Sequence, residues 1–208
     1  MPMLLQPQHP PGATRSLPCA GWRIPALALV GLALAGQVRC RAEPAAAPFR
    51  EYEVKAVFLF NFTQFVDWPP SAFTDDAAPL VITVLGNDPF GPLLEQTVQG
   101  ETMKGRALVV RRCRRVEDVG PCHLLYISSS ENARLPAIFK RLQDRAVLTV
   151  GDADAFAAAG GMIRFTRAQS RVQFDINVAA AQRAGLSVSA KLLKVARVTG
   201  PERLAGRR

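Results

Sequence analysis

Two cysteines and a histidine are the residues of this sequence whose types and spacing most directly suggest chemistry. Cys113 and Cys122 are the cysteines that follow residue 42, and His123 stands directly after the second. An even number of cysteines in an exported domain indicates a disulfide. It would close a ten-residue loop and stabilise the fold by roughly 2.5–3 kcal/mol. The alternative is a redox-sensitive pair, because arginines crowd Cys113 and positive charge favours the thiolate. These arginines are Arg111, Arg112, Arg114 and Arg115.

A catalytic or metal site is hard to assemble from these residues. His123 opens an apolar segment, where a structural imidazole is commoner than a base or a metal ligand. Asp152 and Asp154 lie at an expected helix start, where capping carboxylates are commoner than acid–base pairs. Nucleophile-elbow, phosphate-loop and dinucleotide motifs are absent from the sequence. We therefore predict no enzyme, no cofactor and no metal, and keep a thiol enzyme using Cys122 and His123 as an alternative.

The turn formed by Gly86, Asn87 and Asp88 is the candidate ligand site. It ends one expected strand and precedes an expected helix, the place where α/β sheets collect ligands. Its backbone amides could hold an anion. A turn capped by Asp88 explains the same residues equally well.

Residues 1–42 have the pattern of a signal peptide. Arg15 and Arg23 supply positive charge, and the uncharged apolar run over 24–36 is too short to span a bilayer. We predict cleavage near Ala42 and a periplasmic location. The leader holds four arginines and no acid, so the net charge falls from +9 for the whole chain to +5 after cleavage. Such a mildly basic domain argues against nucleic acid as a partner.

An aromatic helix over 51–68 is expected to organise the core. Its side chains are apolar nearly all round, so we expect cover on more than one side. One interpretation is a central core helix; the other is a helix with one flank on the sheet and one on a partner chain. The candidate residues for the core or partner face are Phe58, Phe60, Phe62, Phe65 and Trp68.

Short apolar segments rich in β-branched residues alternate with helical patterns after residue 80. Strands are expected at 80–85, 105–112, 124–127, 147–150, 162–165 and 172–176. Helices are expected at 89–98, 135–143, 153–159, 177–184 and from 189 onward. The alternation predicts an α/β fold with a mostly parallel sheet, helices on both faces and a C-terminal antiparallel hairpin whose loop spans 166–171. The predicted domain covers 50–199, after a disordered lead-in at 43–49 and before a basic tail at 200–208.

Several segments, in this order, resemble the YfiR family of periplasmic regulatory proteins. The resemblance runs from about Tyr52 to Val198. Its segments are 55–62 with Trp68-Pro69, 86–90, 122–128, 147–152, 160–163, 174–177 and 184–186.

The resemblance implies a regulator with no catalytic residues. The best-understood relative binds the periplasmic part of a membrane-anchored diguanylate cyclase and holds it inactive, and its release favours biofilm formation. Cys113 and Cys122 look like the family cysteine pair that includes the Cys-His strand start. The further pair of some members has no counterpart here.

Three functional hypotheses follow. The first is a periplasmic repressor that binds an inner-membrane diguanylate cyclase in cyclic di-GMP signalling, with a homodimer left open. The second is a periplasmic small-ligand-binding module that uses the turn at residues 86–88. The third is the thiol enzyme described above.

Overall fold

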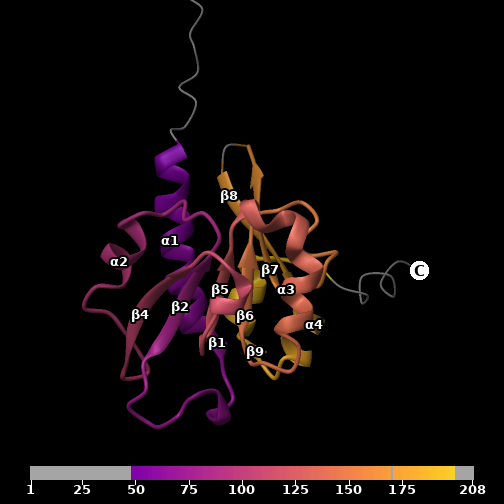
Figure 1. The fold of residues 1–208 in the computed structure, drawn as a ribbon. Coiled ribbons are helices and arrows are strands. Elements are labelled where there is room, and N and C mark those ends of the chain that lie inside the picture. The colour runs from indigo at the N-terminus through magenta and orange to yellow at the C-terminus, as the bar shows by residue number, and fades with distance from the viewer. Residues whose placement is uncertain (1–47, 170, 200–208) are drawn as a thin grey trace, which may run out of the picture. The chain divides into compact units, whose positions relative to one another are not determined.

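The computed structural model describes residues 48–169 and 171–199, which form a mixed α/β domain (Figure 1). The predicted signal peptide, most of the lead-in and the basic tail lie outside these residues. The main sheet has eight strands in the order β10-β8-β7-β6-β5-β2-β4-β3. β2, β4, β5, β6 and β7 run parallel, whereas β8 is antiparallel to β7 and β3 is antiparallel to β4.

The parallel strands are short and apolar, as the sequence predicts. They are β2 (Leu80–Leu85), β4 (Arg106–Cys113), β5 (Leu124–Ile127), β6 (Leu148–Gly151) and β7 (Ile163–Ala168). Every residue of β2, β5 and β6 is buried, which is the pattern of strands in the middle of a parallel sheet. The mixed α/β class with a mostly parallel sheet is thereby confirmed. Helices on both faces stay a prediction.

β7 and β8 (Arg171–Asn177) form the antiparallel pair expected near the C-terminus. Their ladder extends from Ile163 opposite Ile176 to Ala168 opposite Arg171, so the predicted loop over 166–171 is too long. The last strand, β10 (Arg197–Thr199), pairs in parallel with β8. β3 (Thr102–Met103) is the last strand at the opposite end of the sheet.

Helix α1 (Pro48–Phe65) is the longest element of the described chain and starts earlier than expected. It ends at β1 (Val66–Asp67), which pairs with β9 (Ser187–Val188) in a separate two-stranded sheet. The other α-helices are α2 (Leu93–Val98), α3 (Leu135–Arg141), α4 (Val178–Arg183) and α5 (Ala190–Val195). Three short 3-10 turns occur at Pro70–Ala72, Val116–Asp118 and Ser129–Arg134.

The helix predicted over 153–159 is wrong. Residues 154–160 form successive turns instead, because the ring of Phe156 is buried between two glycines and ties the chain to them. A Cβ atom on Gly151 would lie 2.5 Å from this ring, and one on Gly161 would lie 2.2 Å from it. Gly161 N–H also donates to the carbonyl of Phe156. Glycine is therefore required at both positions by close packing.

The core consists of two clusters of buried side chains. Alternate residues of β2 divide between them, with Ile82 in the first cluster and Val81 in the second. The first cluster takes Leu59 and Phe62 from α1, and the second takes Ile138 from α3. α1 thus supplies apolar side chains to the larger part of the core.

Candidate functional site

One face of α1 lies in the core, and the opposite face remains exposed. Ala56, Leu59 and Phe62 are fully buried, whereas Val54 is 44% exposed and Val57 is 50% exposed. The expected cover on more than one side is present, because α1 contacts α2 and α5 as well as the sheet, but it does not extend to the face of Val54 and Val57. Helical periodicity spreads consecutive apolar residues around the axis, and the sheet can cover only those that point toward it.

The predicted aromatic residues of this helix occupy different environments. Phe62 is fully buried, and its ring lies 5.8 Å from Phe165 and 5.1 Å from Phe174. Phe58 is half-buried and stacks on Phe62 at 6.1 Å, so it joins the core to the exposed face. Phe60 and Phe65 are half-buried and pack against the first cluster.

The exposed face of α1 forms a shallow apolar hollow of about 330 Å³. Val54, Val57 and Phe58 supply its apolar wall, and Glu53 and Asn61 supply its polar rim. An apolar patch with a polar rim is a common mark of a protein-interaction site. Of the predicted aromatic set, only Phe58 lines this hollow.

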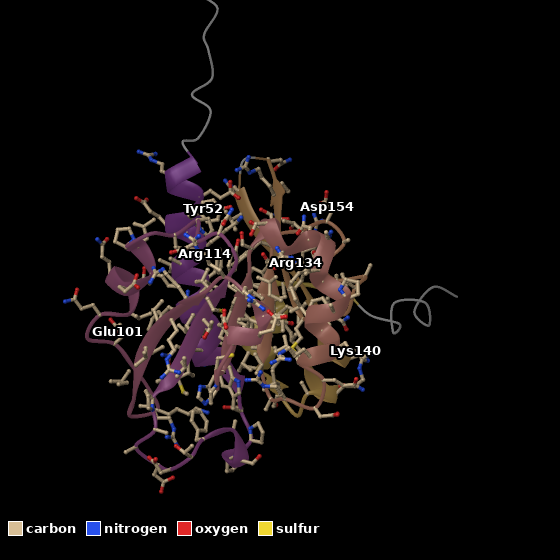
Figure 2. All side chains as sticks on the ribbon, viewed as in Figure 1. Tyr52, Glu101, Arg114, Arg134, Lys140 and Asp154 are labelled. Carbon is tan, nitrogen blue, oxygen red and sulfur yellow. The ribbon has the colours of Figure 1, made fainter. Side chains whose placement is uncertain are left out.

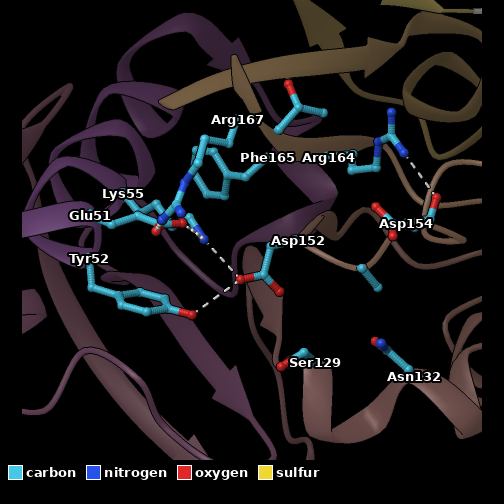
Figure 3. A pocket seen from close by; sticks show the side chains of 12 residues that line it. Glu51, Tyr52, Lys55, Ser129, Asn132, Asp152, Asp154, Arg164, Phe165 and Arg167 are labelled. Atoms are coloured by element: carbon cyan, nitrogen blue, oxygen red, sulfur yellow. Dashed lines mark hydrogen bonds and ion pairs between the residues drawn. The ribbon is translucent and has the colours of Figure 1, made fainter. Parts of the chain in front are cut away.

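A polar cavity of about 450 Å³ lies at the carboxyl ends of β5 and β6, beside the first turns of α1 (Figure 3). Its centre is Asp152, which directly follows β6. The Oδ2 atom of Asp152 accepts hydrogen bonds from Lys55 Nζ at 2.9 Å, Tyr126 Oη at 2.9 Å and Tyr52 Oη at 3.3 Å. Lys55 is only 3% exposed and also pairs with Glu51 at 2.8 Å.

The charges around this cavity are largely paired. Arg167 forms an ion pair with Glu51, and Arg164 binds Asp175 at 2.6 Å. The Oδ1 atom of Asp152, by contrast, is buried and has no partner among the described residues. Burial, followed by the charge of Asp152, raises the pKa of both Tyr52 and Tyr126. Both phenols therefore stay protonated at neutral pH and act as donors.

This cavity was not predicted from the sequence. Lys55 and Asp152 are 97 positions apart, and only the fold brings them together. A lysine within an apolar helix was the one available signal, since a buried lysine needs a partner.

The predicted ligand turn uses its polar groups internally. Asp88 Oδ1 accepts the N–H of Phe90 at 2.8 Å, and Asp88 Oδ2 accepts from Arg112 Nε at 2.5 Å. The amide of Asn87 donates to Ser130 Oγ at 3.0 Å. Gly86 has φ +90°, and a Cβ there would lie 2.5 Å from the same hydroxyl oxygen. Asp88 therefore caps the turn itself, whereas the helix expected from residue 89 begins only at Leu93.

Cys113 and Cys122 are free thiols in this structure, so the predicted disulfide is not formed. β2 lies between β4, which ends at Cys113, and β5, which follows Cys122. Two strand spacings separate β4 and β5 by about 10 Å, whereas a disulfide needs Cα atoms about 4.4–6.8 Å apart. The sequence suggested that these strands were neighbours, because chain order does not reveal the insertion of β2.

The surroundings of the two thiols favour the protonated form. Burial, followed by the charges of Cys122, Asp118 and Glu131, raises the pKa of Cys113 to about 11. Burial also raises the pKa of Cys122. The arginines near Cys113 therefore do not create the reactive thiolate that the sequence suggested.

His123 has a structural role. Its Nδ1 atom accepts the N–H of Val81 at 3.0 Å, and its Nε2 atom lies 3.1 Å from the carbonyl of Ala72. A neutral ring with the proton on Nε2 satisfies both contacts. Trp68 Nε1 donates to the backbone carbonyl of His123 at 3.0 Å, which fixes the end of the aromatic segment. Burial lowers the pKa of His123, so the ring is neutral at neutral pH.

Within the described residues, no group of three or more histidine, cysteine or acidic side chains could hold a metal ion. Among the same residues, no helix has the length and apolar character needed to span a bilayer.

Fold and site together define a small α/β domain. Its long helix exposes an apolar face, and the domain also holds a polar cavity whose charged groups are largely paired. The chain belongs to the YfiR/HmsC-like family, whose sequence profile matches residues 52–197. This family is a regulatory kind of domain and is periplasmic in general. No curated protein matches the chain.

Proposed function

We propose that the protein is a periplasmic, non-catalytic regulator that binds the periplasmic domain of an inner-membrane diguanylate cyclase and represses it. The family match over residues 52–197 carries this proposal. The neutral His123 and the protonated thiols support a binding role rather than thiol catalysis.

The exposed face of α1 is the binding surface that we propose for the cyclase. Val54, Val57 and Phe58 offer apolar area that the domain itself leaves uncovered. Burying about two valine side chains and part of a phenylalanine could supply several kcal/mol, since each fully buried apolar side chain contributes roughly 1.5–3 kcal/mol. The half-buried Phe58 also connects this face to the core through Phe62.

The test is recovery of the complex from native membranes, with cyclic di-GMP measured in the same cells. Val57→Glu places a charge in the proposed interface and should abolish recovery of the cyclase and raise cyclic di-GMP. Val195→Glu is the matched control, because Val195 is a 72% exposed valine on α5. Recovery of no membrane signalling protein by the unaltered chain, with unchanged cyclic di-GMP after gene deletion, would overturn the proposal.

A small-ligand-binding module is the second candidate, and the cavity at Asp152 favours it over the turn at residues 86–88. The buried Oδ1 atom of Asp152 lacks the hydrogen bond that a ligand donor could supply. The prediction is that a polar metabolite raises the melting temperature of the unaltered chain. Asn132→Ala, on the rim of the cavity, should abolish this gain, and Asn87→Ala, at the turn, should leave it unchanged.

A further inference from the structure

The outer edge of β4 lacks a strand partner over most of its length among the described residues. β3 pairs with β4 only at Met103 opposite Arg106 and Thr102 opposite Ala107. The chain then turns away, since the amide of Glu101 donates to the carbonyl of Val98 and Gly100 has φ +76°. The pairing between β3 and β4 therefore ends before Leu108.

The backbone groups that this edge presents follow from the register of β4 with β2. Cys113 accepts a hydrogen bond from the amide of Gly86, so the polar backbone groups of Cys113 point toward β2. Backbone groups alternate in direction along a strand, so those of Leu108, Val110 and Arg112 point outward. An edge of this kind can template a further strand.

The two faces of the edge differ in chemistry. On one face, a groove of about 590 Å³ is lined by the apolar residues Val98, Leu108 and Val110. Two acidic residues also line it: Glu95, which pairs with Arg112, and Glu101, which Figure 2 labels. Arg111 points to the other face, as does Cys113 two residues later, and Cys113 packs on the second core cluster. Arg111 is exposed and forms no ion pair with any described residue.

We propose that the edge of β4 binds an extended acidic segment of a partner protein, which adds to the sheet as a further strand. Alternate side chains of such a segment point to opposite faces. Apolar residues would fill the groove over Leu108 and Val110, and acidic residues would meet Arg111. Arg114, just beyond the end of the strand and also exposed, extends the positive charge.

A second copy of the chain fits this edge poorly. β4 contains no acidic residue, so pairing two β4 edges would leave Arg111 without an opposite charge on the neighbouring strand. Arg112 is already held by Asp88 at 2.5 Å and by Glu95. The unpaired charge of Arg111 thus favours an acidic strand over a second copy of β4.

The test uses a capped peptide of alternating glutamate and valine residues, added to the full-length protein. Titration calorimetry should detect binding, and hydrogen exchange should show slower exchange at the amides of Val110 and Arg112. Arg111→Glu should weaken the affinity by about tenfold, since it turns an attractive pair into a repulsive one. Arg183→Glu, an exposed arginine on α4, is the matched control and should leave the affinity unchanged.

Two methylated peptides separate strand addition from simple charge attraction. One carries N-methyl groups on all valine amides, and the other carries them on all glutamate amides. In an added strand, only one of these sets faces β4, so one peptide should lose binding and the other should retain it. Equal binding of both, no binding of the parent peptide, or self-association of the protein through β4 would each overturn the proposal.

Discussion

Three consecutive residues of α1 allow a direct test of the difference between its buried and exposed faces. Val57 is 50% exposed, Phe58 is half-buried and Leu59 is fully buried. Leu59→Ala removes three carbons, worth about 2.4 kcal/mol at about 0.8 kcal/mol per buried CH₂ group. The cavity left behind raises the expected loss of unfolding free energy to about 3–5 kcal/mol.

The same substitution at Val57 should be nearly neutral. It removes two half-exposed carbons, which lowers the unfolding free energy by about 0.8 kcal/mol. The higher helix propensity of alanine raises it by about 0.5 kcal/mol. Urea unfolding followed by circular dichroism measures both free energies. The expected order of destabilisation is Leu59→Ala, then Phe58→Ala, then Val57→Ala. Losses for Leu59→Ala and Val57→Ala that agree within about 0.5 kcal/mol would refute this difference between the two faces.

The remaining predictions concern stability. The pKa of His123 is lowered by burial, so folding disfavours the charged imidazole. The unfolding free energy should therefore be highest above about pH 6.5 and should decrease as the pH falls below that value. Lys55→Met should cost about 3–5 kcal/mol because it leaves the largely buried carboxylate of Asp152 without its ion-pair partner, whereas Lys104→Met removes an exposed pair worth about 0–1 kcal/mol. Gly161→Ala should lower the melting temperature by clashing with a buried ring, and Gly120→Ala should not, since open space surrounds it.

Each of these predictions has an outcome that contradicts it. For the pH dependence, His123→Gln should flatten the loss of unfolding free energy between pH 7 and 5, and an unchanged slope would assign the loss to other groups. For the ion pairs, equal losses from Lys55→Met and Lys104→Met in urea unfolding would contradict a buried network at Asp152. For the glycines, equal melting temperatures of Gly161→Ala and Gly120→Ala would mean that the ring of Phe156 relaxes freely.

Local patterns predicted the buried strands well. The strands at Leu80–Leu85 and Leu124–Ile127 have the predicted bounds, because a short run of buried β-branched and large apolar residues has few other stable uses. The helix predicted over 153–159 is wrong. Its alanines have high helix propensity, but the packing of Phe156 against two glycines determines the backbone conformation there. Local propensity could not reveal this packing.

Strand order explains the failure at the cysteines. The sequence shows Cys113 at the end of one strand and Cys122 before the next, and chain order suggested that these strands pair. β2 pairs with both and separates them, which no local pattern encodes. The polar cavity could not be predicted for the same reason, because Lys55 and Asp152 meet only after α1 packs beside the end of β6.

The amino-acid sequence by itself determined the mixed α/β class, the principal strands and the family, because these depend on short-range periodicity and on ordered local motifs. Only the tertiary structure decided which face of α1 is exposed, which edge of the sheet stays open at β4, and which polar groups meet at Asp152. Those features depend on contacts between residues far apart in the chain, and such contacts exist only once the sheet has assembled.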